Sequence, residues 1–246
     1  MEGCKANKVK RVVITSSCAA IMACLEKDRP KNLTFTEENW SEPNNNPDID
    51  AYSKSKTMAE RAAWDFVAAL PESERFEVAT INPGLILGPA FVGKGFSSGD
   101  IISKFMLGGF PAIPRAQIMC VDVRECAEAH LEALKRPDAA GKRFILVHSC
   151  LWLDDIAAIL AKEFKGKGYK INQAKMPRWV ASLASYFIRE VALVLKTWGK
   201  EFTFVNAQSR EVLGLKYDIT MEQSINEMAY SMIETGVIPN KLPKQK

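Results

Sequence analysis

Hydrophobic positions follow two periodicities in turn along the chain. Short apolar, β-branched runs at 11–15 and 77–81 end in small or polar residues, which is typical of buried strands. Residues 51–70 repeat apolar and small side chains at helical spacing, which predicts a helix. The segment 19–50 has a weak apolar pattern with three prolines, so we expect mostly loop there.

The alternation continues beyond the second run. Strands that alternate with long helices favour right-handed βαβ units and a parallel sheet. The pattern therefore predicts an α/β fold. We expect further strands at 117–121 and 143–148, and helices at 100–107, 123–135, 151–164, 178–197, 206–213 and 220–234.

The composition is that of a globular chain. Of 246 residues, 47% are hydrophobic and 25% charged, with a net charge of +4, which excludes a disordered chain. Lys and Arg are scattered, so the sequence does not indicate a nucleic-acid-binding protein. The longest apolar stretch, 179–198, contains charged residues, and we expect no segment that spans a bilayer. We interpret this stretch as a helix that packs over a substrate pocket.

Cysteine and histidine positions favour neither a disulfide framework nor a metal site. The six cysteines show no CxxC spacing, and the N-terminus has no secretory signal. We therefore expect reduced thiols and a cytoplasmic protein. Two lone histidines, His130 and His148, are too few for a metal centre, and packing roles are predicted for both.

Polar side chains follow the first predicted strand. In an open parallel sheet, ligands bind beyond the carboxyl ends of the strands, and this strand ends in Thr15, Ser16 and Ser17. The helix after the loop begins with Tyr52 and Lys56, which share one helix face because they are four residues apart. A lysine ammonium beside a phenol stabilises the phenolate, and a serine hydroxyl can hold the same substrate oxygen. These residue types suit proton transfer at a carbonyl or alcohol oxygen while hydride moves at its carbon.

Four segments carry a resemblance to a known family. They are KRVVITSS (10–17), YSKSKTMAERAAWDF (52–66), INPGLILGP (81–89) and VDVRECAEAH (121–130). In type and order they resemble the extended short-chain dehydrogenases/reductases, close to the dihydroflavonol-4-reductase, cinnamoyl-CoA reductase and NAD-dependent epimerase/dehydratase group. The resemblance implies a Rossmann-like, doubly wound parallel sheet and an NAD(P)-dependent oxidoreductase that reduces a ketone or aldehyde to an alcohol.

The resemblance also implies roles for individual residues. Ser17 would be the catalytic serine, Tyr52 the acid/base that protonates the new alkoxide, and Lys56 the residue that favours the tyrosinate. The cofactor would be NADP or NAD, with NADP favoured, and the segment 83–85 would line its nicotinamide carboxamide. The expected cofactor-binding residues are Thr15, Ser16, Tyr52, Lys56, Pro83, Gly84, Leu85 and Ser98.

The same resemblance suggests how the chain is divided. Residues 1–150 would form part of an NAD(P)-binding Rossmann domain, from its fourth strand onward, with a substrate-side loop insertion near 84–116. Residues 151–246 would form a smaller, mostly helical substrate-binding region. A homodimer through the helix that contains Tyr52 is compatible with the family.

Two departures from the family pattern leave the substrate open. Dihydroflavonol reductases carry an Asn five residues after the catalytic serine, where this chain has Met22. The DAYSKSK segment lacks the aromatic- and Cys-containing motif of cinnamoyl-CoA reductases. Gly93, Gly95 and Gly99 have the wrong spacing for a phosphate-binding loop and predict a flexible loop over the active site.

A third departure concerns the phosphate-binding loop. The family begins with a strand, a TGxxGxxG loop and a helix whose N-terminus holds the pyrophosphate, and no such loop precedes Val12. Two hypotheses follow. The first is an NAD(P)H-dependent reductase of which this sequence is a fragment, an incomplete gene model or a short isoform. The second is a catalytically silent product that keeps Ser17, Tyr52 and Lys56, does not bind cofactor, and acts through a partner.

Overall fold

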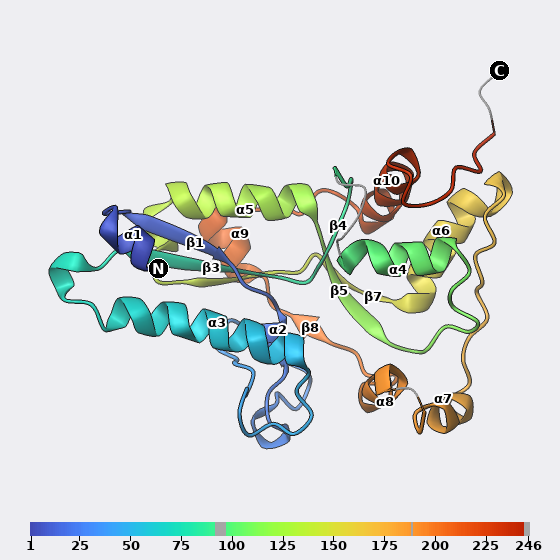
Figure 1. The fold of residues 1–246 in the computed structure, drawn as a ribbon, viewed down its shortest axis with the longest axis horizontal. Helices are drawn as coiled ribbons and strands as arrows, with labels where there is room; N and C mark the ends of the chain where they lie inside the picture. Colours follow the sequence, from blue (N-terminus) through green and yellow to red (C-terminus); the bar gives the residue numbers. More distant parts are fainter. Residues whose placement is uncertain (92–96, 188, 244–246) are drawn as a thin grey trace. The chain divides into compact units, whose positions relative to one another are not determined.

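The computed structural model describes residues 1–91, 97–187 and 189–243 (Figure 1). They form two compact units, each assembled from three segments of the chain. Unit 1 consists of Met1–Gly84, Arg124–His148 and Phe202–Asp218, and unit 2 of Leu85–Val123, Ser149–Glu201 and Ile219–Lys246. The division into a cofactor region and a substrate region near residue 150 stays a prediction. Of the glycines assigned above to a loop, Gly93 and Gly95 lie outside the described residues, and Gly99 lies in a helix.

Unit 1 contains a parallel sheet, as the alternation of strands and helices predicts. Strands β1 (Arg11–Thr15), β3 (Glu77–Pro83) and β6 (Arg143–Leu146) pair in the order β1-β3-β6, and both pairs are parallel. Helices α3 (Ala51–Ala68) and α5 (Val123–Lys135) run along the two sides of these strands (Figure 1). Strand β3 is buried from its second residue to its last, as expected for a central parallel strand covered on both faces.

The remaining elements of unit 1 are short. The predicted loop at 19–50 contains only a four-residue helix, one turn of 3₁₀ helix and a two-residue strand. That strand pairs in parallel with β8, where Phe35 stacks on Phe202 and Phe204 with ring centroids 6.4 and 5.2 Å apart. The elements are α1 (Glu2–Ala6), α2 (Ala19–Met22), β2 (Thr34–Phe35), β8 (Thr203–Phe204), α9 (Ala207–Leu213), and the 3₁₀ turns Glu26–Asp28, Glu72–Glu74 and Pro137–Ala139.

Unit 2 combines a small mixed sheet with helices. Strands β4 (Leu85–Leu87) and β5 (Gln117–Asp122) are parallel, whereas β7 (Ser149–Trp152) runs antiparallel to β5. The hydrophobic core of unit 2 contains apolar side chains of β4 and β5 and of helices α4, α6 and α10. The helical elements are α4 (Ser97–Met106), α6 (Leu153–Phe164), α7 (Arg178–Ala184), α8 (Arg189–Lys196), α10 (Met221–Glu234) and the 3₁₀ turn Lys165–Lys167.

Two expected elements differ from the structure. The strand expected at 143–148 ends at Leu146, and 149–152 form a separate strand that delays the next helix to Leu153. A short apolar run does not distinguish a strand from the start of a helix, and pairing with β5 decides it here. The helix expected at 178–197 is two helices, because α7 ends at Ala184 and α8 begins at Arg189. Ser185 caps the end of α7, and its hydroxyl donates to the Ser182 carbonyl.

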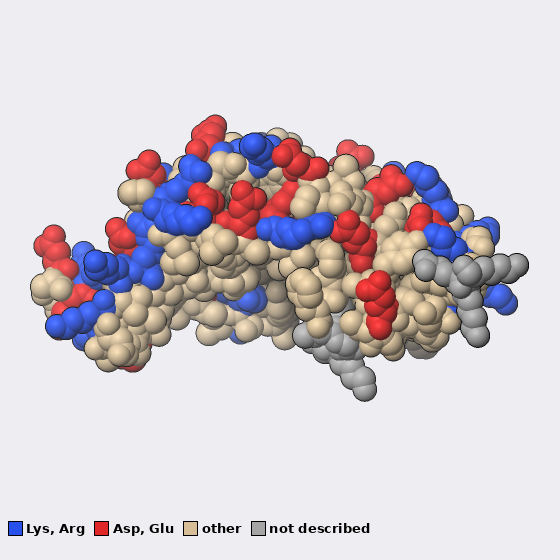
Figure 2. Space-filling model, turned by 90° about the horizontal axis from the view of Figure 1, so that it is seen from above, with Lys and Arg blue, Asp and Glu red and all other residues tan. Residues whose placement is uncertain are grey.

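The surface and the thiols offer few special features. Acidic and basic side chains are interspersed on the face seen in Figure 2. All six cysteines are free thiols. Within 1–91, 97–187 and 189–243, no helix is long and apolar enough to cross a bilayer, and no cluster of three metal-ligating side chains occurs.

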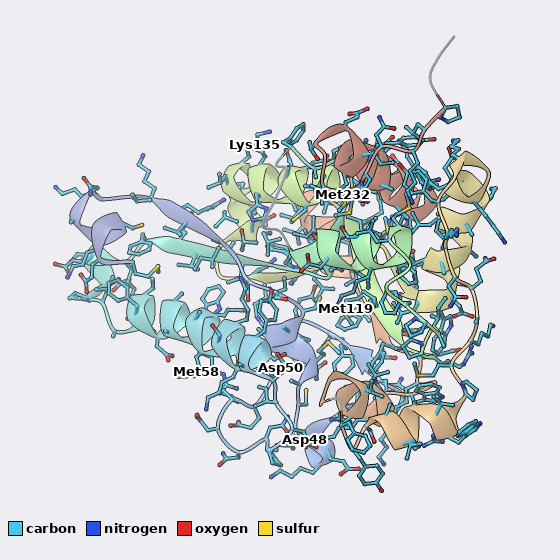
Figure 3. The ribbon with its side chains drawn as sticks, turned by 45° about the vertical axis from the view of Figure 1, so that its right-hand side comes forward. Asp48, Asp50, Met58, Met119, Lys135 and Met232 are labelled. Atoms are coloured by element: carbon cyan, nitrogen blue, oxygen red, sulfur yellow. The ribbon has the colours of Figure 1, made fainter. Side chains whose placement is uncertain are left out.

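Helix α3 begins at a capped N-terminus. Asp50 accepts hydrogen bonds from the Ser53 backbone N–H at 2.9 Å and from the Ser53 hydroxyl at 2.5 Å. Figure 3 shows Asp50 at the start of α3 and Met58 further along it. Burial disfavours the carboxylate, but the hydrogen bonds from Ser53 and the local backbone outweigh burial and hold the pKa of Asp50 below its ordinary value. The cap therefore fixes the backbone just before Tyr52.

We expect Asp50→Ala to lower the free energy of unfolding by about 1 kcal/mol at neutral pH. A carboxyl with a lowered pKa in the folded state stabilises above its unfolded pKa of about 4, and this contribution is lost as pH falls through the folded value. The difference between the variant and the wild type should therefore shrink below about pH 4 in urea titrations. Asp50→Asn keeps an acceptor oxygen and is the control. If Asn destabilises as much as Ala at neutral pH, the capping bond is not the cause.

Candidate active site

The segment after β1 is held by backbone hydrogen bonds to β3. The Ser16 N–H donates to the Ile81 carbonyl at 2.7 Å, and the Cys18 N–H donates to the Pro83 carbonyl at 2.9 Å. Ser16 and Ser17 are both buried. Side chains at these positions are therefore presented by a fixed backbone at the carboxyl end of the sheet.

Helix α3 reaches this strand end through Lys56. Its Nζ donates to the Thr15 carbonyl at 3.1 Å, which links the helix face that carries Tyr52 to the last residue of β1. Tyr52 itself is 59% exposed, so its phenol is open to a ligand. Lys56 thus joins the start of α3 to the end of β1.

Hydrogen bonds hold both the side chain and the main chain of Ser17. Its hydroxyl oxygen accepts from the Ala19 N–H at 3.1 Å, and its carbonyl accepts from the Asn82 side-chain amide at 3.3 Å. The hydroxyl proton of Ser17 is not used in the first of these bonds and can be donated to a substrate oxygen. Helix α2, which starts two residues later, packs against α3.

A buried carboxylate on α3 was not predicted from the sequence. Glu60 is 1% exposed and lies four residues after Lys56 on the same helix. One of its oxygens accepts from the Ser16 hydroxyl and from the Asn82 amide at 2.8 Å. The other accepts from Thr80 Oγ1 at 3.1 Å and from Arg143 Nε at 2.6 Å. Glu60 thus joins α3 to β3, to β6 and to the residue that directly follows β1.

Arg143 neutralises this carboxylate and is itself anchored. Its Nη1 donates to the carbonyls of Glu37 and Asn39 at 2.6 and 2.7 Å, and its guanidinium lies 3.7 Å from the ring centroid of Trp40. Burial raises the pKa of the nearby Glu37 carboxyl above its ordinary value, while the Ile145 N–H bonded to it opposes the shift. The segment before α3 is therefore tied to β6.

The structure connects His130 to the end of β1. Its Nδ1 lies 2.7 Å from the Cys126 carbonyl and its Nε2 lies 2.7 Å from Thr15 Oγ1. A carbonyl only accepts, so Nδ1 is the donor, and in the neutral ring Nε2 accepts the Thr15 hydroxyl proton. His130 therefore positions Thr15 from α5, consistent with the packing role predicted for it.

The remaining predicted cofactor residues divide between the units. Pro83 ends β3, and the Gly84 N–H donates to the Leu146 carbonyl at 3.0 Å, so this amide already serves the sheet. Leu85 opens β4 and the half-buried Ser98 lies in α4, both in unit 2. Unit 1 alone brings together the strand end 15–17 and the helix face of Tyr52 and Lys56.

Comparisons with known proteins find reductases among the relatives of this chain. The NADPH-dependent methylglyoxal reductase of Saccharomyces cerevisiae is 34% identical over 169 residues, covering 65% of this chain and 49% of that protein. Cinnamoyl-CoA reductase 2 of Arabidopsis thaliana is 28% identical over 241 residues, covering 94% of this chain and 62% of the reductase. The crystal structure of yeast methylglyoxal/isovaleraldehyde reductase complexed with NADPH has a TM-score of 0.71 at 26% identity, over 96% of this chain and 68% of that one. No protein-family model matches the sequence.

The fold is α/β with a parallel sheet, and the relatives named above are reductases. These relatives support the resemblance to the extended short-chain dehydrogenases/reductases, of the dihydroflavonol-4-reductase-like group, that the four motifs carry. It spans about half to two thirds of the length of the two curated relatives named above.

Replacement of Glu60 tests the buried network. We expect Glu60→Gln to lower the free energy of unfolding by about 3 kcal/mol, because it leaves the buried Arg143 without a counter-charge. Urea unfolding followed by circular dichroism measures the change. Glu222→Gln, which breaks an exposed ion pair with Lys162, is the control and should change stability little. Equal, small effects of both variants would refute a structural role for the Glu60 pair.

Proposed function

We propose that the chain carries the catalytic residues of an NADPH-dependent reductase that converts a ketone or aldehyde to an alcohol. The observation that carries the proposal is the bond from Lys56 Nζ to the Thr15 carbonyl. It links the helix face with Tyr52 to the strand end with Ser17, which is the arrangement that proton transfer to a substrate oxygen needs.

Each of the three residues has a distinct task. Tyr52 donates its phenolic proton to the substrate oxygen as that oxygen becomes an alkoxide. The Ser17 hydroxyl donates a hydrogen bond to the same oxygen and orients it toward Tyr52. Lys56 stabilises the phenolate left on Tyr52 because its ammonium carries a full positive charge on the same helix face. Burial of Ser17 and anchoring of its backbone reduce the entropy lost when the substrate is oriented.

The residues present fit the ribose and nicotinamide end of the proposed cofactor. One Lys56 N–H bond goes to Thr15, which leaves two ammonium hydrogens for ribose hydroxyls. When bound, NADPH would supply the hydride that enters the carbonyl carbon. The Gly84 amide donates within the sheet, so any contact of that segment with the carboxamide would use other groups, such as the second lone pair of the Pro83 carbonyl.

The proposed substrate class is a small or medium carbonyl compound. Two relatives support this substrate class, because one is a methylglyoxal reductase and the other is a cinnamoyl-CoA reductase. Met22, half-buried at the end of α2, stands where a polar Asn would contact a flavonoid, so an apolar substrate flank is favoured there.

The test compares Tyr52→Phe with the unmodified chain. NADPH binding is titrated by nicotinamide fluorescence, and turnover of methylglyoxal and a panel of aldehydes is followed by NADPH absorbance. We expect Tyr52→Phe to reduce turnover by about a hundredfold or more while cofactor binding persists, because the proton donor is lost and the ring is kept. Tyr186→Phe removes an exposed hydroxyl elsewhere and is the matched control.

Two results would overturn the proposal. If the unmodified chain does not bind NADPH even at millimolar cofactor, the catalytically silent hypothesis replaces it for this chain. If Tyr52→Phe turns over as fast as the control, Tyr52 is not the proton donor.

A further inference from the structure

Helix α7 and the turn after it expose four large apolar side chains. Trp179 and Leu183 lie one turn apart on α7, Tyr186 and Phe187 follow in the turn after the helix, and the four are 70%, 61%, 84% and 85% exposed, in that order. A helix packed over a substrate pocket is the expectation for this stretch, whereas these four side chains are open to solvent. We call them the α7 face. Helix α8 packs beside α7 in unit 2 (Figure 1).

The α7 face is embedded in a basic stretch of the chain. From Lys165 to Arg189 the sequence has six basic residues and no acidic one. Two of them, Lys175 and Arg178, are exposed and immediately precede the aromatic row. An exposed aromatic face with a cationic flank is the combination that anionic membrane surfaces attract.

A hollow in unit 2 adjoins the start of α7. It has a volume of about 200 Å³, and its walls include Arg178 and Trp198. On another wall, Arg115 lies 4.2 Å from the ring centroid of Trp152, and Lys175 pairs with Asp154 at 2.8 Å. Three cations against one carboxylate leave the hollow with net positive charge, which suits a phosphate group.

We propose that the α7 face docks on an anionic lipid bilayer, with the aromatic side chains at the headgroup level and lipid phosphates beside Arg178 and Arg115. Trp and Tyr favour the membrane interface because their rings are amphipathic. A second copy of the chain fits less well, because a symmetric contact would bring the same basic flanks together. The proposal concerns where the protein resides and is independent of its catalytic activity.

Co-sedimentation with vesicles tests the proposal. Vesicles of phosphatidylcholine alone are compared with vesicles that also contain phosphatidylserine. We expect binding to the anionic vesicles only, and its loss at high salt, where the Debye length falls to about 3 Å. The double variant Trp179→Ser with Phe187→Ser should weaken binding at least about tenfold, because two aromatic side chains that would insert into the bilayer interface are removed. Leu131→Ser with Leu134→Ser, on exposed positions of α5, is the matched control.

A separate variant tests whether binding to anionic vesicles needs the positive charge beside the α7 face. Arg178→Glu should weaken binding about tenfold, whereas Lys31→Glu, an equal charge change at an exposed site of unit 1, should change it little. Quenching of tryptophan fluorescence by brominated lipid should fall in Trp179→Phe. Equal binding to neutral vesicles, or equal loss in the controls, overturns the proposal. A lipid-free dimer that Trp179→Ser with Phe187→Ser disrupts also overturns it, in favour of a second copy.

Discussion

A carboxylate buried away from water needs full compensation, and the arrangement of unit 1 depends on how Glu60 obtains it. The charge is balanced by Arg143, and the remaining acceptor capacity is filled by Ser16, Thr80 and Asn82. These partners lie on β3, on β6 and directly after β1, so helix α3, which carries Glu60, cannot slide or rotate without leaving a buried charge unpaired. The exposed Tyr52 and the half-buried Lys56 are positioned by this interior contact, because they lie on the same helix.

Patterning along the chain predicted most of this fold. Strands β1 and β3, helices α3 and α5 and the residues at their ends follow from periodicity and from turn residues. The separate strand β7 did not, because only its pairing with β5 distinguishes it from a helix start. The break between α7 and α8 also lies inside one continuous apolar stretch.

The candidate site was predictable to a similar extent. The strand end and the Tyr52–Lys56 spacing are local signals, and a resemblance in four motifs supplied their proposed roles. Glu60 and Arg143 are 83 positions apart, and no local pattern pairs them. The interval from Lys56 to Glu60 repeats that from Tyr52 to Lys56, which was a usable signal for a third functional position on α3.

The strand ends of unit 1 are joined to one another by main-chain groups. Ser16, Cys18 and Gly84 donate their amide hydrogens to the carbonyls of Ile81, Pro83 and Leu146. Such bonds do not depend on side-chain identity, provided that the residue is not proline. Residues at 19 and 22 can therefore change between relatives while the main-chain hydrogen bonds next to them persist. Substrate preference can then diverge over evolutionary time without the fold having to be rebuilt.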